Sequence, residues 1–448
     1  MSGIHAGLKK FTTAAITLLS FHAATSTAAP LGTRTVLENG AVLLVAERPS
    51  IPMVVASVMF KSGAVADPTP KAGLANLTAE LLLRGTKKHS AQALAEELDF
   101  LGASLSADAD YEATTVSLTT LSKNLDQALG LLAEVVVTPT FPQEEFEQKK
   151  KEIAGGLASR EEQPGWVAQR TFRATLYPQH PYGRQVEGDP ATLAALTQAD
   201  VKQFHQTHYR PNNAIITFVG DVTQAQVTAL LEKHFPDWRQ APLPEISWPE
   251  SPQLSATRVT VDKKVSQANV MLGHYGIARE NPDYYTLWVM NYILGDRGTE
   301  SRLMKRVREE LGLVYSIGSN FSPRLRPGPF YIALQTKNES ATQAIDESLR
   351  LLRQLIADGL TQEELDAAKA YLINSFPLRL ASNRGVASIL PVLEFYNLGL
   401  DYPDRYADLI GQVTLDKVKN VAQTYLHPDQ ILQVVVADLA KAGMEKSP

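Results

Sequence analysis

Leu196-Thr-Gln-Ala-Asp-Val-Lys-Gln-Phe-His-Gln-Thr-His-Tyr-Arg-Pro-Asn-Asn-Ala-Ile-Ile-Thr-Phe-Val-Gly-Asp221 is the stretch that decides the fold, because the chain contains it twice. It aligns without gaps with Val413-Thr-Leu-Asp-Lys-Val-Lys-Asn-Val-Ala-Gln-Thr-Tyr-Leu-His-Pro-Asp-Gln-Ile-Leu-Gln-Val-Val-Val-Ala-Asp438. Identical pairs include Val201 with Val418, Lys202 with Lys419, Thr207 with Thr424, Pro211 with Pro428, and Asp221 with Asp438. Each copy predicts a helix, a turn marked by proline, and a buried strand.

A second match lies earlier in each half, where Gln143-Glu-Glu-Phe-Glu-Gln-Lys149 parallels Gln362-Glu-Glu-Leu-Asp-Ala-Ala-Lys369. Coincidence between two common helix–turn–strand units is the alternative. Two matches in the same order at nearly one spacing favour an internal duplication. Residues 237–252 are rich in proline, which is typical of a semi-rigid linker. The predicted domains are 30–236 and 257–448, joined by a linker at 237–256.

The rest of the chain mixes strands and helices. Predicted strands cover 35–45 (two strands around an Asn-Gly turn), 54–60 and 114–118. Predicted helices cover 73–83, 90–101, 125–136 and a long segment that begins after Pro142. Because strands and helices do not alternate strictly, the sequence predicts an α+β fold rather than a doubly wound sheet.

Composition excludes several classes of function. The chain has 448 residues, of which 44% are hydrophobic and 20% charged, with a net charge of −5, so it offers no basic field for nucleic acid. It contains no cysteine, which excludes disulfides and thiolate metal sites.

The N-terminus has the form of a secretory signal peptide. Lys9 and Lys10 precede an apolar run at 11–21, and small residues follow at 23–29. A membrane anchor is the alternative, but the run is shorter than the roughly 20 apolar residues that span a bilayer. We therefore expect cleavage of residues 1–29 and export to the periplasm without a membrane anchor.

A cation and a phenol follow each other closely in the second half. In Ser301-Arg-Leu-Met-Lys-Arg-Val-Arg-Glu-Glu-Leu-Gly-Leu-Val-Tyr315-Ser316, apolar residues recur at helical spacing until Gly312 ends the helix. Leu313, Tyr315 and Ile317 then alternate as in a strand. Arg308 and Tyr315 can thus face one space and hold a peptide carbonyl or an oxyanion. The alternative is a surface arginine beside a half-buried tyrosine.

Several stretches together resemble one family of peptidases. They are Ile293-Leu-Gly-Asp-Arg-Gly-Thr-Glu-Ser-Arg-Leu303 with Arg308 and Gly312-Leu-Val-Tyr315, Gly73-Leu-Ala with Leu82-Leu-Arg-Gly-Thr86, and His180-Pro-Tyr-Gly183 with Gly188. In order and spacing they resemble the inverted-zincin peptidases, the family of pitrilysin and the mitochondrial processing peptidase. The resemblance implies two homologous domains, each a mixed, mainly antiparallel sheet with helices on one face, which form a clam-like half-chamber.

The chain differs from that family at the positions that bind the metal. Family members bind zinc through His-x-x-Glu-His. The resemblance places Asn76 and Glu80 at the histidines and Ala79 at the general base, and Gly155 or Gly156 at the third ligand, a glutamate. These residues cannot replace two imidazoles, a base and a carboxylate, so we expect no metal in this chain.

Other residues do not supply a second metal site. His205 and His208 lie three apart on a helix without a matching base, and a satisfied or solvated histidine is the better interpretation. His180 lies in a loop beside proline, where a structural role is expected. Asp108 and Asp110 alternate along a predicted strand, as on a solvated face.

The resemblance also implies a partner. In the family, an arginine and a tyrosine seven residues apart bind the substrate backbone opposite the zinc, and Arg308 and Tyr315 keep that spacing. Some members work as unlike pairs, with zinc on one subunit only.

The first hypothesis is a zinc-free subunit that binds peptide and contributes Arg308 and Tyr315 to a homologous, zinc-bearing partner. The second is a non-enzymatic peptide-binding or scaffold protein. An independent hydrolase is disfavoured because no Gly-x-Ser-x-Gly elbow is present.

Overall fold

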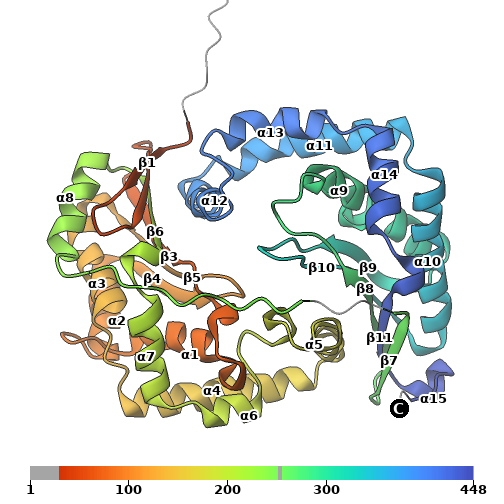
Figure 1. Cartoon of the computed structure of the whole chain (residues 1–448), viewed down its shortest axis with the longest axis horizontal. Coiled ribbons are helices and arrows are strands. Elements are labelled where there is room, and N and C mark those ends of the chain that lie inside the picture. Colours follow the sequence, from red (N-terminus) through yellow and green to blue (C-terminus); the bar gives the residue numbers. More distant parts are fainter. Residues whose placement is uncertain (1–29, 251–254, 447–448) are drawn as a thin grey trace, which may run out of the picture.

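The computed structural model describes residues 30–250 and 255–446 and contains two sheets, one from each half of the chain (Figure 1). The predicted signal peptide, residues 1–29, lies outside the described residues. Mixed sheets with many helices confirm the predicted α+β class. The predicted boundaries of the two domains stay predictions, although the strands of the first sheet all fall within 33–220 and those of the second within 257–437.

The first sheet has six strands in the order β1-β2-β6-β3-β5-β4. Their bounds are β1 Thr33–Val36, β2 Val42–Glu47, β3 Met53–Phe60, β4 Ser104–Ala109, β5 Thr114–Leu121 and β6 Ala214–Gly220. The second sheet has five strands in the order β7-β11-β8-β10-β9. Their bounds are β7 Thr257–Asp262, β8 Gln267–Tyr275, β9 Val314–Phe321, β10 Pro329–Lys337 and β11 Leu432–Ala437. Each sheet has one parallel pair, β2 with β6 and β7 with β11, and is otherwise antiparallel.

Helices surround the sheets. In the first half they are α1 Leu74–Leu81, α2 Ala91–Leu101, α3 Leu125–Val137, α4 Gln143–Glu161, α5 Pro164–Leu176, α6 Pro190–Ala195, α7 Gln198–His208 and α8 Gln224–His234. In the second half they are α9 Tyr284–Asn291, α10 Ala341–Asp358, α11 Gln362–Arg379, α12 Asn383–Phe395, α13 Tyr402–Gly411, α14 Leu415–Tyr425 and α15 Leu439–Ala442, with π-helical segments η7 Tyr292–Asp296 and η9 Met304–Glu310. None of the helices in the described part of the chain combines the length and apolarity that a bilayer crossing requires.

The internal duplication is visible in the order of the elements. The repeated stretches form α7 followed by β6 in the first half and α14 followed by β11 in the second. The earlier match begins α4 and α11, and each is followed at once by a second helix, α5 or α12. The two sheets then share the strand order β2-β6-β3-β5-β4 and β7-β11-β8-β10-β9, and β1 is an addition at one edge.

One helix of each half packs on the sheet of the other half. This exchange of helices, α5 and α12, joins the two halves into one body. In Figure 1, α5 lies beside β8 and β11 of the second sheet, and α12 lies beside β3 and β6 of the first. Alternate strand residues face opposite sides, so one face of each sheet packs on helices of its own half. The other face of the second sheet packs on Phe172 and Leu176 of α5, and that of the first sheet on Val386 and Leu390 of α12.

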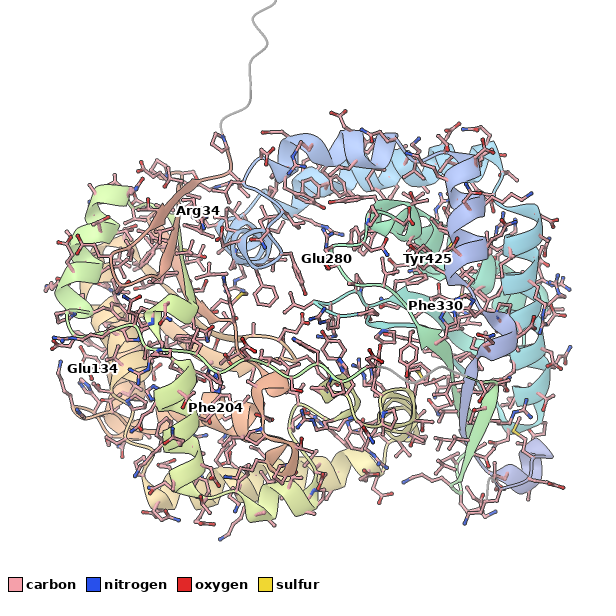
Figure 2. The ribbon with its side chains drawn as sticks, in the orientation of Figure 1. Arg34, Glu134, Phe204, Glu280, Phe330 and Tyr425 are labelled. Carbon is pink, nitrogen blue, oxygen red and sulfur yellow. The ribbon has the colours of Figure 1, made fainter. Side chains whose placement is uncertain are left out.

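Polar contacts add to this exchange. Arg34 of β1 donates two hydrogen bonds of 2.8 Å to the carboxylate of Glu394 in α12, and Figure 2 shows Arg34 beside that helix. Both side chains remain partly exposed, so the pair fixes the position of α12 more than it stabilises the fold. The predicted half-chamber is therefore built from two interlocked halves.

Candidate functional site

The first candidate region is α1, the helix in the position of a zinc helix. Asp67 is buried and accepts hydrogen bonds from the backbone N–H groups of Gly73 (2.9 Å) and Ala75 (2.8 Å), which places a carboxyl group at the start of this helix. Asn76 is 9% exposed and Ala79 is 0% exposed. The helix therefore turns an amide and a methyl group inward at the positions where the motif requires a metal ligand and a base.

Glu80, the third position of the degenerate motif, is held by α4. The buried Lys149 ammonium lies 3.3 Å from the Glu80 carboxylate and 2.5 Å from that of Glu152. Arg84 approaches Glu152 (3.8 Å) and Glu145 (3.7 Å). The hydrogen bond from Lys149 holds the pKa of Glu152 below its ordinary value. A divalent cation here would meet the fixed positive charges that already neutralise these carboxylates, so the arrangement is a salt-bridged helix junction.

The third ligand position of the family falls on a glycine, Gly155 or Gly156, which has no side chain to bind a metal. A Cβ atom added at Gly155 or at Gly156 meets nothing within 4 Å, so there is space for a carboxylate that the sequence does not supply. Within residues 30–250 and 255–446, no three His, Asp or Glu side chains gather in a way that could hold a metal ion. The donor set around α1 therefore does not fit zinc.

The second candidate region is the helix-to-strand corner that carries Arg308. This residue lies in the last turn of η9, a π-helical segment anchored by the fully buried Val307. Gly312 follows with a φ of 63°, in the left-handed region that favours glycine, so the predicted helix end is confirmed. The corner leads directly into β9, the edge strand of the second sheet.

Tyr315 lies at an irregularity in that edge strand. The ladder pairs Ser316 with Gln335 but Val314 with Thr336, so Tyr315 is the additional residue of a β-bulge. The strand predicted from Leu313, Tyr315 and Ile317 is present as β9, but the bulge interrupts the alternation at Tyr315, which is exposed. Its side chain is 68% exposed, more than the half-buried tyrosine of the alternative interpretation.

Arg308 and Tyr315 are both free to meet a ligand. Both side chains are exposed, and among the described residues no hydrogen bond or ion pair engages the guanidinium or the phenol. By contrast, Arg306 in the same segment donates to Glu310 at 2.8 Å. That the two side chains act together on one peptide stays a prediction.

The histidines are satisfied inside the fold, as predicted. A ring nitrogen of His205 lies 2.8 Å from the carbonyl oxygen of Val136, and one of His208 lies 3.1 Å from the hydroxyl of Ser62. Burial lowers the pKa of both imidazoles to about 4. His180 is also buried and accepts a hydrogen bond from a backbone N–H two residues on. These roles are structural.

The sequence suggested that Asp110 lies on a solvated strand face. It lies outside the strand instead, because β4 ends at Ala109. Its carboxylate accepts hydrogen bonds from the backbone N–H groups of Glu112 (2.7 Å) and Ala113 (2.8 Å) and so shapes the turn to β5. Asp108 remains within the strand and is exposed, so the prediction of a solvated strand face is confirmed for this residue.

A buried carboxylate that the sequence reasoning missed joins the two halves. Glu112 is 4% exposed and accepts hydrogen bonds from the hydroxyl of Tyr182, from the hydroxyl of Tyr396 (2.9 Å) and from the backbone N–H of Leu325 (2.8 Å). Tyr182 belongs to the first half, and the other two donors belong to the second. Burial raises the pKa of both tyrosines. No local motif marks this cluster, because its members come from four distant segments.

Comparison with family models places both halves in one family. Residues 42–190 match the model described as insulinase, peptidase family M16, and residues 195–372 match the peptidase M16 inactive domain.

Individual relatives cover nearly the whole chain. A crystal structure of a peptidase M16 inactive domain from Pseudomonas fluorescens is 30% identical, covers 93% of this chain and 99% of its own, and superposes with a TM-score of 0.85. A non-peptidase homolog, YmxG, from Helicobacter pylori is 27% identical and covers 87% of this chain and 90% of its own length. An uncharacterized zinc protease from Rickettsia felis is 24% identical and covers 86% of this chain and 93% of its own length.

Proposed function

The chain belongs to the M16 peptidase family, and we propose that it is the zinc-free subunit of an exported heterodimeric zinc peptidase. It binds peptide and contributes Arg308 and Tyr315 to the active site of a homologous partner. The partner supplies the zinc ion and the general base. The observation that carries the proposal is a contrast between two regions. At α1, Lys149 neutralises Glu80, whereas at the edge of β9 a cation and a phenol have no partner in the part of the chain that the structure describes.

Chemistry supports this division of labour. Hydrolysis of a peptide bond develops negative charge on the carbonyl oxygen, and donors that meet this oxygen in the transition state accelerate the reaction. Arg308 is a permanent cation with several donors, and the Tyr315 hydroxyl is a neutral donor. An extended peptide beside the edge strand β9 would present its carbonyl groups to donors on that strand.

The experiment is reconstitution with a zinc-bearing M16 homologue that retains His-x-x-Glu-His. Hydrolysis of a fluorogenic peptide is measured for the pair with this chain as wild type, Arg308→Ala or Tyr315→Phe. We expect each variant to lower kcat/KM by about 100-fold, since losing one oxyanion donor costs on the order of 3 kcal/mol. Arg306→Ala is the matched control, because Arg306 lies in the same helical segment but is paired with Glu310. Full activity of both test variants refutes the contribution in trans.

A second candidate is a non-enzymatic peptide-binding or scaffold protein, which the relative described as a non-peptidase homolog favours. This function requires affinity for peptides without hydrolysis in any pairing. The same reconstitution separates the two candidates, because only the subunit function makes the partner's activity depend on Arg308 and Tyr315.

A further inference from the structure

A small cavity in the second half lies apart from both candidate regions. It measures about 170 Å³, is partly open to solvent, and is lined by residues of α9, α11, α12 and α13 and of the loops beside them. No position of the degenerate metal motif lines it, and neither do Arg308 and Tyr315. Its function must therefore be argued from its own walls.

The walls are mainly aromatic. Phe376 of α11 stacks on Tyr406 of α13, with ring centroids 4.0 Å apart, and meets Tyr402 edge-on at 6.1 Å. Tyr284 and Trp288 of α9, which also line the cavity, are stacked at 6.0 Å. Aromatic walls of this kind favour a planar, apolar occupant, because ring–ring contacts add to the gain from burying apolar surface.

The cavity has room for one aromatic ring. A protein cavity of about 150 Å³ with apolar walls holds one benzene molecule. The value of 170 Å³ here is therefore sufficient for a phenyl or phenol group.

Two arginines give the cavity a positive side. The guanidinium of Arg279 lies 3.6 Å above the ring of Tyr284, and Arg379 lines the same cavity from the end of α11. Within the described parts of the chain, no carboxylate forms an ion pair with either arginine. Asp296 is close enough for the charge of Arg379 to act on its carboxylate, but the two do not form an ion pair. Glu280, labelled in Figure 2, is exposed on the loop before α9 and pairs with neither arginine. A guanidinium stacked on a ring keeps its N–H edge available for an anion.

A buried donor also lacks an acceptor. The indole N–H of Trp288 is buried, and it has no hydrogen-bond partner among the described residues. A buried donor without an acceptor is costly, so a ligand oxygen that accepts from it would gain affinity. This unsatisfied donor belongs to a residue that lines the cavity and is a second feature, independent of the arginines, that suits an oxygen-bearing ligand.

We propose that this cavity binds an aromatic carboxylate, with the ring between Phe376 and Trp288 and the carboxylate at Arg279 and Arg379. Such a group occurs in free aromatic acids and at the C-terminus of a peptide that ends in phenylalanine or tyrosine. The proposal does not depend on the subunit role, because none of its residues belongs to the Arg308 and Tyr315 corner.

The test is calorimetric titration of the full chain with three probes: N-acetylphenylalanine, its C-terminal amide, and the peptide Gly-Gly-Phe. We expect the acid to bind at least about tenfold more tightly than the amide, because charge-assisted hydrogen bonds to arginine are lost in the amide. Tighter binding of Gly-Gly-Phe than of the free acid identifies a peptide C-terminus as the source, and equal binding identifies a free acid. No binding of the acid, or equal affinity for acid and amide, overturns the proposal.

Variants locate the site. Arg379→Gln, at an exposed position, should weaken binding of the acid about tenfold and leave binding of the amide unchanged. Ser388→Phe, also exposed, places a ring at the cavity and should abolish binding of both. Arg350→Gln on α10 is the matched control and should bind as wild type. Wild-type affinity in both test variants, confirmed as folded by circular dichroism, refutes the assignment.

Discussion

Replacing Glu112 by alanine should loosen the junction between the two halves. The carboxylate is 4% exposed and accepts three hydrogen bonds, and two of the three donors come from the second half. A hydrogen bond to a charged group contributes about 1.5–3 kcal/mol, offset in part by the cost of burying the carboxylate. The alanine variant leaves the buried Tyr182 hydroxyl and two part-buried donors without their acceptor, so we expect a loss of about 3–5 kcal/mol in the free energy of unfolding.

Urea denaturation followed by intrinsic fluorescence measures this loss, and limited proteolysis tests whether the chain becomes easier to cleave between the two halves. Glu96→Ala is the matched control, because Glu96 is exposed and, within the described residues, its side chain hydrogen-bonds to Gln92 of its own helix, at 2.8 Å, and to no residue of the second half. A double-mutant cycle of Glu112→Gln with Tyr396→Phe isolates the link to the second half. A loss below about 1 kcal/mol for Glu112→Ala, or additive effects in the cycle, would show that the cluster does not couple the halves.

Three further predictions concern a buried histidine, a glycine before α1 and the metal content of the chain. His205→Gln should reduce the acid sensitivity of folding. The folded pKa of His205, about 4, lies below the ordinary value of 6.5, so this residue contributes stability above pH 6.5 that is lost as pH falls towards 4, by about 3 kcal/mol. Between about pH 7 and pH 4 the glutamine variant, measured by urea denaturation, should lose about 3 kcal/mol less than wild type, because His208 and the other buried histidines still contribute. Gly73→Ala should destabilise the fold by about 2 kcal/mol or more, because φ is +97° and the new Cβ would lie 2.6 Å from the carbonyl oxygen of Glu187; an unchanged melting temperature refutes this. Elemental analysis of the purified chain should give no stoichiometric zinc, and EDTA should leave its melting temperature unchanged; tightly bound zinc would falsify the interpretation of Asn76, Ala79 and Glu80.

Local features were predictable from the sequence because their causes are local. The helix capped by Ser90 and ended by Gly102 is present, with the Ser90 hydroxyl accepting from the backbone N–H of Ala93 and Gly102 at a φ of 59°. The duplicated helix and strand were also predictable, because both copies repeat the same apolar spacing and the same proline. Family membership followed from motif order and is confirmed by the family models.

Features that depend on contacts between distant segments were not predictable. The exposure of Tyr315 depends on a register shift against Gln335, which no pattern within β9 encodes. The Glu112 cluster needs a turn, a loop, a hairpin and the end of α12 to meet. The exchange of α5 and α12 is also a tertiary property: each helix shows an apolar face, but its sequence does not say which sheet that face covers.

This exchange has a consequence for how a peptide can reach the chain. Separating the halves would expose the sheet faces now covered by Phe172 and Leu176 of α5 and by Val386 and Leu390 of α12. Each of these side chains is fully buried or nearly so, and exposing four such side chains costs roughly 6–12 kcal/mol. A cost of this size is comparable to the whole stability of a typical domain, so the two halves must move as one body. Opening and closing around a peptide then requires a second, separate body, and for the proposed peptidase that body is the zinc-bearing partner.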